Sequence, residues 1–241
     1  MGGIKMRIKV IVPVSTDIWN KMIEEAYSKH KDPDTEITIV NIKKGPESIE
    51  MIYDEVWAEL EALLEAEKAE KEGYDAVIDY CFGDPGLMAI KEALDIPVVG
   101  LCEPSIHIAS TLGRKFSVVG VGGMKAKGMV LERVKSYGLE HKLASVRLVE
   151  IKVLDIKKDF DKLVEALYEE AKKAVEEDGA DVIVLGCGSL LNIAEILQKR
   201  LGVPVIDPGL AALKYTEMLV KLGLKQSKKA YPKPYEKKRT M

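Results

Sequence analysis

The chain has 241 residues, of which 47% are hydrophobic, 31% charged and 6% aromatic. That length can bury one large core or two small ones, and the apolar fraction argues against intrinsic disorder. The 36 basic and 39 acidic side chains leave a net charge of −3, so no overall positive field favours nucleic acid or an anionic membrane. No apolar run reaches the ~20 residues of a membrane helix, and the N-terminus does not resemble a signal peptide. We therefore expect a soluble, cytoplasmic protein.

The cysteine and amide content narrows the class further. Cys81, Cys102 and Cys187 are too few and too widely spaced for a disulfide framework or a Cys-x-x-Cys motif, so we expect free thiols in a reducing compartment. Asn occurs three times and Gln twice, whereas Glu and Lys are abundant. This bias is typical of thermostable proteins.

Short runs rich in Val and Ile alternate with helical patterns along the whole chain. Strands are predicted, in order, at 9–14, 36–42, 76–80, 97–101, 116–121, 146–153, 182–185 and 204–206. Helices are predicted between them at 18–29, 49–71, 85–94, 125–137, 159–177, 190–201 and 210–222. The alternation predicts an α/β fold made of two pseudo-symmetric, doubly wound lobes, each with a roughly four-stranded parallel sheet.

The two halves of the chain repeat one another. Segment 73–81 aligns without a gap with segment 179–187, and both begin with Gly, have Asp in third place and end in Cys. The repeat predicts a first lobe at 1–110 (its N-terminal residues able to exchange between lobes), a second at 111–225, and the site in the interlobe cleft. Residues 226–241 are interpreted as a basic tail that is solvated or clasps another subunit, not as a nucleic-acid site.

The two matched cysteines each follow a buried strand, and ligands of parallel sheets bind at the carboxyl ends of strands. Asp84 with Pro85, and Ser189 in the second copy, are predicted to begin helices directly after them. The helix dipole would then lower each thiol pKa below ~8.5, and free N–H groups would hold a carboxylate or enolate oxygen. Cys102 has no counterpart in the second copy and is predicted to be a bystander at the cleft rim, without a helix start beside it.

A mirrored pair of acidic groups suits one reaction in particular. Racemisation at a carbon α to a carbonyl needs a base on one face and an acid on the other, with the roles exchanged for the opposite enantiomer. A duplicated fold supplies two such groups. Cys81 and Cys187 are therefore the candidate catalytic residues.

With these motifs the sequence resembles the aspartate/glutamate/hydantoin racemase superfamily, and within it the hydantoin-racemase-like branch. The resemblance covers most of the chain, in the expected order, through segments 45–54, 75–86, 96–100, 115–119, 184–187 and 202–207. It implies a cofactor-independent racemase or epimerase acting α to a carboxylate or amide carbonyl by 1,1-proton transfer between two thiols. It also implies no metal, a small carboxylate or hydantoin-like substrate, and a homo-oligomer.

The substrate pocket departs from the family pattern. The family's first strand usually ends in Asn-Pro-Asn-Thr, where this chain has Val-Pro-Val-Ser-Thr at 12–16, and the threonines expected after the fifth strand are replaced by glycines at 120–123. The residues expected to bind substrate are Ser15, Phe82, Gly83, Gly120, Val121, Gly188 and Ser189.

Other interpretations stay open at this stage. The same scaffold supports related reactions, such as maleate cis–trans isomerisation or malonate decarboxylation, and a non-catalytic small-anion-binding protein is a further alternative. The glycine-rich segment 120–128 has Lys125 where a dinucleotide motif needs its third glycine, so nucleotide binding is not predicted. His30, His107 and His141 lack partners at metal-ligand spacing, although His107 could reach a ligand at the site edge.

Overall fold

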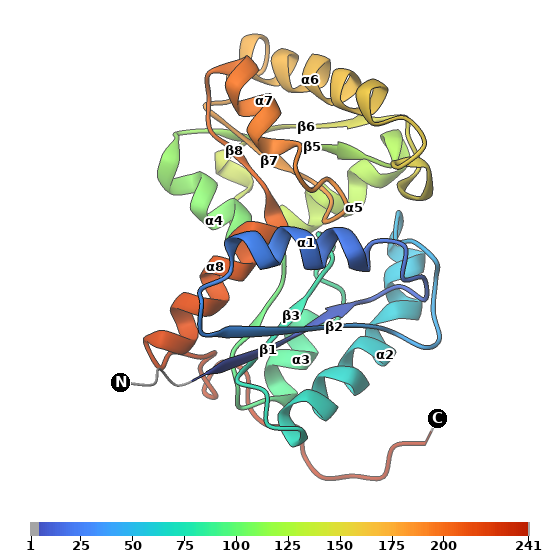
Figure 1. Cartoon of the computed structure of the whole chain (residues 1–241), viewed down its shortest axis with the longest axis vertical. Coiled ribbons are helices and arrows are strands. Elements are labelled where there is room, and N and C mark those ends of the chain that lie inside the picture. Colours follow the sequence, from blue (N-terminus) through green and yellow to red (C-terminus); the bar gives the residue numbers. More distant parts are fainter. Residues whose placement is uncertain (1–4, 241) are drawn as a thin grey trace.

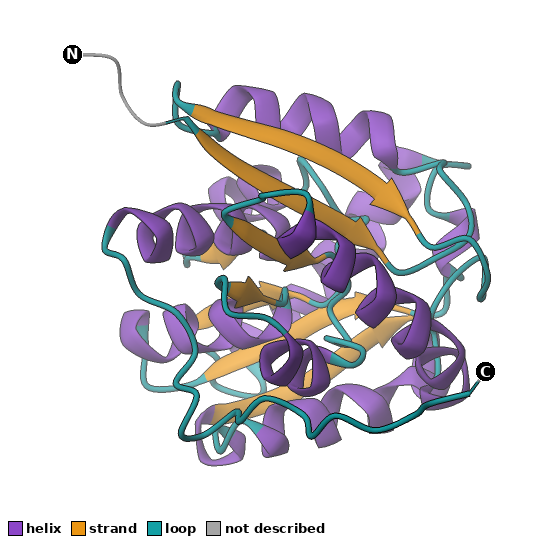
Figure 2. Ribbon diagram, turned by 90° about the horizontal axis from the view of Figure 1, so that it is seen from below, coloured by secondary structure: helices purple, strands orange, loops and turns teal. Residues whose placement is uncertain are grey.

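The computed structural model describes residues 5–240 and contains two four-stranded sheets whose strands are all parallel (Figures 1 and 2). The strand order is β2-β1-β3-β4 in one sheet and β6-β5-β7-β8 in the other. The strands are β1 Met6–Val12, β2 Thr35–Asn41, β3 Ala76–Asp79, β4 Val98–Val99, β5 Phe116–Val121, β6 Leu143–Val149, β7 Val182–Leu185 and β8 Val205–Ile206. The identical order in both halves confirms the predicted fold class.

Eight α-helices connect and cover the described strands. They are α1 Asn20–His30, α2 Ile52–Lys71, α3 Leu87–Ala93, α4 Cys102–Leu112, α5 Gly123–Ser136, α6 Phe160–Glu176, α7 Ala194–Leu201 and α8 Pro208–Lys221. Two short 3₁₀ turns are η1 Glu140–Lys142 and η2 Val153–Asp155. The central strands β1, β3, β5 and β7 are buried because helices lie on both faces of each sheet, which explains why Val and Ile are their commonest residues.

Helices α4 and α8 each follow the last strand of one sheet but pack against the other sheet. Helix α4 contacts β5, β7 and α5, whereas α8 contacts β3, β4 and α1, and the two helices also pack on one another (Figure 1). Their apolar faces are buried there, with Cys102 and Ile106 from α4 and Leu213 from α8 fully covered. This exchange holds the two sheets together around the site.

Helix α4 was not predicted from the sequence, because the side chain that caps its N-terminus comes from a distant loop. Asp84 was predicted to begin the helix directly after it, but α3 begins at Leu87, and the Asp84 carboxylate instead accepts the N–H groups of Leu101, Cys102 and Glu103 at 2.7, 3.0 and 3.0 Å. The cap of α4 is therefore supplied from seventeen or more residues upstream, which no local pattern reveals.

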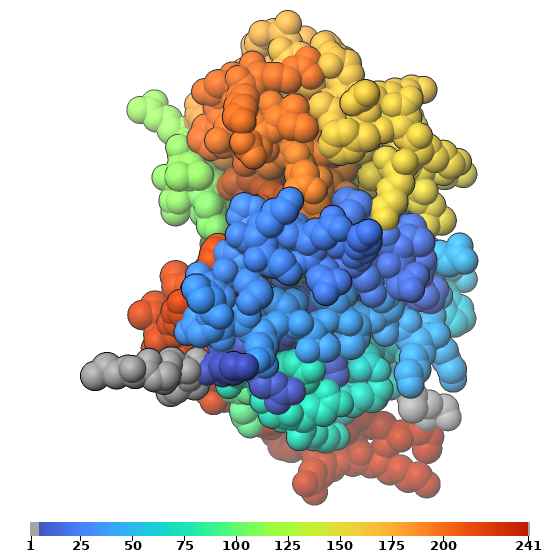
Figure 3. Space-filling model, viewed as in Figure 1, coloured from blue at the N-terminus to red at the C-terminus, as the bar shows by residue number. Residues whose placement is uncertain are grey.

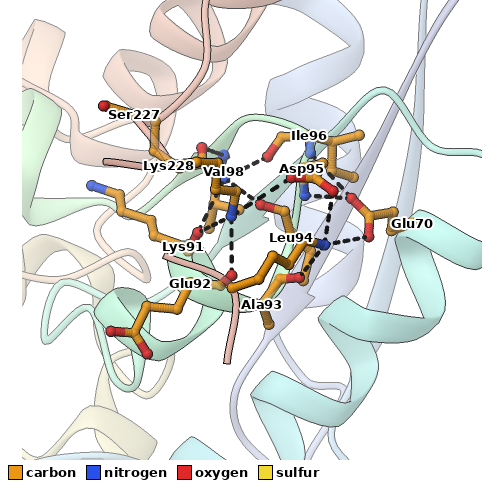
Figure 4. A network of polar contacts seen from close by, with 12 residues as sticks. Glu70, Lys91, Glu92, Ala93, Leu94, Asp95, Ile96, Val98, Ser227 and Lys228 are labelled. Carbon is orange, nitrogen blue, oxygen red and sulfur yellow. Dashed lines mark hydrogen bonds and ion pairs between the residues drawn. The ribbon is translucent and has the colours of Figure 1, made fainter. Parts of the chain in front are cut away.

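The segment after α8 runs along the base of the first half, where it is red in Figures 1 and 3. The Gln226 side-chain amide donates to the carbonyls of Leu94 and Ile96 at 2.9 and 2.8 Å, and its oxygen accepts the N–H of Val98 at 3.2 Å. Lys228 donates to two further carbonyls at the end of α3, within the polar network of Figure 4. The tail thus satisfies carbonyl groups that the end of a helix leaves open.

Replacement of Gln226 by alanine should lower the free energy of unfolding by about 1–3 kcal/mol, because partly buried backbone groups lose their partners. Urea denaturation followed by circular dichroism measures the loss. Lys225→Ala changes an exposed neighbour and serves as the control, expected within about 0.5 kcal/mol of the wild type. Equal stability of the two variants would contradict this account of the tail.

Candidate active site

A cavity lies between the two halves, at the carboxyl ends of β1, β3 and β7. Its walls carry both matched cysteines together with mainly apolar side chains. The lining residues are Val12, Pro13, Val14, Trp19, Ser48, Ile49, Tyr80, Cys81, Phe82 and Gly83 from the first half, and Met129, Val153, Gly186, Cys187, Gly188 and Ser189 from the second.

Six of the residues singled out in the sequence meet in this lining, namely Cys81, Phe82, Gly83, Cys187, Gly188 and Ser189. The other three lie outside it. Ser15 is exposed and bonds the Pro46 carbonyl, Gly120 packs against Gly186 behind the wall, and Val121 ends the buried strand β5.

Other side chains near the site could not be placed from sequence. His107 is exposed on α4, edge-on to the ring of Tyr137, and does not line the cavity. Trp19 and Met129 do line the cavity, although no motif in the sequence singled them out. Ser48 belongs to the Gly-Pro-x-Ser-Ile-Glu segment that carried the family resemblance, which was the available signal for it.

The thiols stand in turns rather than at helix N-termini, which corrects the prediction from sequence. Helix α3 begins at Leu87 and α7 at Ala194, each several residues beyond its cysteine. Individual donors take the place of the dipole. The nearby N–H of Gly83 acts to lower the pKa of Cys81, and the N–H and hydroxyl of Ser189 act to lower that of Cys187.

Burial dominates the acidity of both thiols. It raises the pKa of Cys187 above its ordinary value, and it raises the pKa of Cys81 further, with the neighbouring Asp79 adding to the effect. The expected lowering of these pKa values is therefore wrong, because the donors only partly offset desolvation. Cys102 was predicted to lie at the cleft rim without a helix start beside it, and this was wrong. It is fully buried as the first residue of α4, where burial also raises its thiol pKa.

Tyr80 connects the two cysteine turns. Its hydroxyl donates to the Gly188 carbonyl at 3.0 Å, so the residue before Cys81 is bonded to the residue after Cys187. A β-carbon on Gly188 would lie 2.9 Å from the Tyr80 ring, so the contact requires glycine there. Tyr27 makes a parallel bond to the Gly209 carbonyl at 2.9 Å and packs edge-on against Tyr80. The hydrogen bond of Tyr80 fixes the spacing of the two turns.

Acidic side chains are buried on the Cys81 side of the cavity. Glu55 bonds Arg133 at 3.2 Å, and Asp84 accepts the Tyr137 hydroxyl at 2.6 Å. Burial raises the pKa of Glu55 to about 7 and that of Asp84 to about 6.

Within residues 5–240, no group of three or more His, Cys, Asp or Glu side chains is arranged to hold a metal ion. In the same range, no helix is both long and apolar enough to span a membrane.

Comparison with known proteins shows the family to which this chain belongs. The sequence model of the Asp/Glu/Hydantoin racemase family matches residues 8–216. The chain belongs to this family. Its sequence is 44% identical to a hydantoin racemase of Pseudomonas sp. (strain NS671) over 233 residues, which is 96% of this chain and 93% of that protein.

Solved structures of relatives agree with the family and with the fold. The allantoin racemase of Pseudomonas fluorescens has a TM-score of 0.92 and 34% identity, over 98% of this chain and 100% of that one. Arylmalonate decarboxylase, at 21% identity and a TM-score of 0.64 over 91% of this chain and 94% of that one, shares the fold. The family member described here is thus an isomerase of the racemase type, not a binding protein that has only kept the fold.

Proposed function

We propose that this racemase inverts 5-substituted hydantoins by two-thiol proton transfer, without a cofactor. The observation that carries the proposal is the presence of both matched cysteines on one cavity, each contributed by a different half of the chain. The hydantoin racemase and allantoin racemase relatives support the substrate class.

The proposed chemistry uses the two thiols that different halves of the chain contribute to one cavity. The thiolate of one cysteine removes the hydrogen from C5, which is acidified by the adjacent carbonyl, and the thiol of the other delivers a proton to the opposite face of the same carbon. The electron pair of the broken C–H bond passes to the carbonyl oxygen as an enolate and returns to carbon when the new C–H bond forms. A hydantoin carbonyl makes this carbanion accessible, so the proposed step needs no further electron acceptor.

The lining favours a neutral substrate over a charged one. Among residues 5–240, no Asp, Glu, Lys, Arg or His side chain belongs to the cavity wall. An amino acid or dicarboxylate would therefore be stripped of water without a counter-charge, whereas a hydantoin ring carries no formal charge. Val12 and Val14 stand where the family more often has asparagines, and together with Trp19 they make this part of the lining apolar, which favours an apolar 5-substituent.

Isotope exchange tests the proposal directly. Enzyme passed through a chelating resin and a desalting column, incubated with one enantiomer of 5-benzylhydantoin in D₂O, should form the other enantiomer with deuterium at C5. Glutamate and aspartate should show no exchange above the enzyme-free rate. Exchange confined to the charged amino acids, or strictly dependent on added pyridoxal phosphate, would refute the proposal.

A further inference from the structure

The two thiols have different surroundings, although they occupy matching positions in the repeat. The N–H and the hydroxyl of Ser189 both act to lower the pKa of the Cys187 thiol. At Cys81 the N–H of Gly83 acts in the same direction. Because donated hydrogen bonds stabilise a thiolate, these contacts favour a negative charge on Cys187 over one on Cys81.

A buried carboxyl group lies beside Cys81. Glu55, in the first turn of α2, is 3% exposed. A β-carbon built on Gly83 would overlap Glu55 Oε1 and would lie 3.6 Å from Cys81 Sγ, so both atoms flank the same α-carbon. The glycine thereby allows the carboxyl group to approach the turn that carries the thiol.

Glu55 is held in place from the other half of the molecule. Its Oε2 accepts a hydrogen bond from Arg133 of α5 at 3.2 Å, whereas Oε1 is buried without a hydrogen-bond partner among residues 5–240. Burial is the main cause that raises the pKa of Glu55 to about 7, with Glu59 and Asp84 adding to it and Arg133 opposing it. The carboxyl group is therefore ionised above about pH 7.

Other titratable groups lie around Cys81. Asp79 is fully buried, and among residues 5–240 neither of its oxygens has a hydrogen-bond partner. Burial raises its own pKa well above the ordinary value, and its charge, where present, raises the pKa of Cys81. Asp84 is compensated by three N–H groups and the Tyr137 hydroxyl. The neighbouring thiol of Cys102 is buried, with a raised pKa. Glu55 differs from Asp79 and Asp84 in that one of its oxygens is paired with Arg133, while the other has no hydrogen-bond partner among residues 5–240.

We propose that Glu55 is a positioning residue that keeps Cys81 protonated, so that Cys187 is the thiol that ionises first and acts as the base, with Cys81 as the acid. This assignment rests on the two-thiol function proposed above. A carboxylate in a site of low dielectric disfavours a second negative charge nearby. In one inversion the Cys187 thiolate takes the proton from C5 and becomes a thiol, while Cys81 gives its proton to the opposite face and becomes the thiolate. After product release, Cys81 regains a proton from water and Cys187 loses one to water, which restores the starting state. The opposite enantiomer reverses both transfers.

Alkylation of the thiols tests the assignment without relying on turnover. Wild-type protein is treated with iodoacetamide between pH 6 and 11, and each cysteine peptide is quantified by mass spectrometry. Both Cys81 and Cys187 are partly exposed, so the reagent can reach them, and the pH midpoint reports ionisation rather than access. We expect Cys187 to have the lower midpoint. A lower midpoint for Cys81 overturns the proposal, whatever the behaviour of any variant.

Glu55→Gln then tests the residue itself, because the amide keeps the shape and removes the charge. At pH 8.5 the alkylation rate of Cys81 should rise about tenfold, with that of Cys187 unchanged, and the high-pH limb of kcat/KM should move to lower pH. Glu55→Asp, which keeps the charge, should stay near the wild-type rate. Glu67→Gln, on the same helix, is the matched control and should leave Cys81 unchanged.

Two kinds of failure are distinguishable. Identical Cys81 rates in Glu55→Gln and Glu67→Gln overturn the role of Glu55 while leaving two-thiol catalysis intact. Racemisation that survives the loss of either cysteine instead removes the proposed function itself, and it is measured in separate variants.

Discussion

Cys81→Ser and Cys187→Ser are each expected to lower the rate of racemisation by about 10²- to 10⁴-fold, the usual contribution of a positioned acid or base. A serine hydroxyl is far less acidic than a thiol, so each variant lacks one of the two groups that inversion requires. Both side chains line the cavity, and serine is close in size to cysteine, so the fold should be preserved. Polarimetry on one enantiomer of 5-benzylhydantoin measures the loss.

Hydrogen exchange separates a lost acid or base from general damage to the site. Each variant retains one thiol, which can still remove and return the hydrogen on its own face. In D₂O, one variant should therefore exchange one enantiomer and the other variant the opposite enantiomer, both without inversion. Cys102→Ala, at a buried cysteine outside the cavity, should racemise at the wild-type rate per folded molecule. Racemisation retained by either serine variant would contradict the mechanism.

Much of the fold could be predicted because its signals are local. Short Val- and Ile-rich runs gave the eight strands, and the repeat of Gly, Asp and Cys at equal spacing gave the duplication that the matching strand orders confirm. Helix α4 escaped prediction because the group that caps it, Asp84, lies in a different loop. The packing of α4 and α8 on each other's sheets likewise depends on contacts between distant segments.

The position of the candidate site could also be predicted, because the signals that locate it are local. The acidity of its two thiols could not be predicted. The end of a buried strand places a cysteine at a sheet edge, so position in the sequence located Cys81 and Cys187. Their acidity depends on how deeply the turns are covered, and burial outweighs the donors that the sequence suggested. In the sequence, Glu55 is one of many acidic residues on a charged helix. Only its contact with Gly83 in the structure shows that it lies beside the turn that carries the Cys81 thiol.

The duplication therefore accounts for the scaffold but not for the balance between its two thiols. A symmetric pair would leave the resting protonation state undefined, with either sulfur equally able to carry the charge. Here Ser189 acts to lower the pKa of one thiol, whereas Glu55 lies beside the other, so the two halves have diverged where proton position matters. Catalysis by the two sulfurs also requires a fixed separation between them. The contacts between the Cys81 turn and the Cys187 turn maintain that separation.

Tyr80→Phe should reveal those contacts as a loss of catalysis. The change keeps the ring and removes the hydroxyl that bonds the Gly188 carbonyl, so the two cysteine turns lose their direct hydrogen bond. We expect kcat to fall about 10- to 100-fold, because small displacements of reacting groups are costly. The free energy of unfolding should fall by about 1–3 kcal/mol, as a buried carbonyl loses its donor.

Tyr27→Phe provides the matched control for this prediction. It removes the same kind of bond, from a buried tyrosine to the Gly209 carbonyl, but neither residue lines the cavity. We expect a similar loss of stability in urea, with kcat within about twofold of the wild type because the cysteine turns keep their spacing. Equal kcat in the two variants would show that Tyr80 contributes to stability alone. A selective fall in Tyr80→Phe would show that joining the two turns is part of how the duplicated fold achieves catalysis.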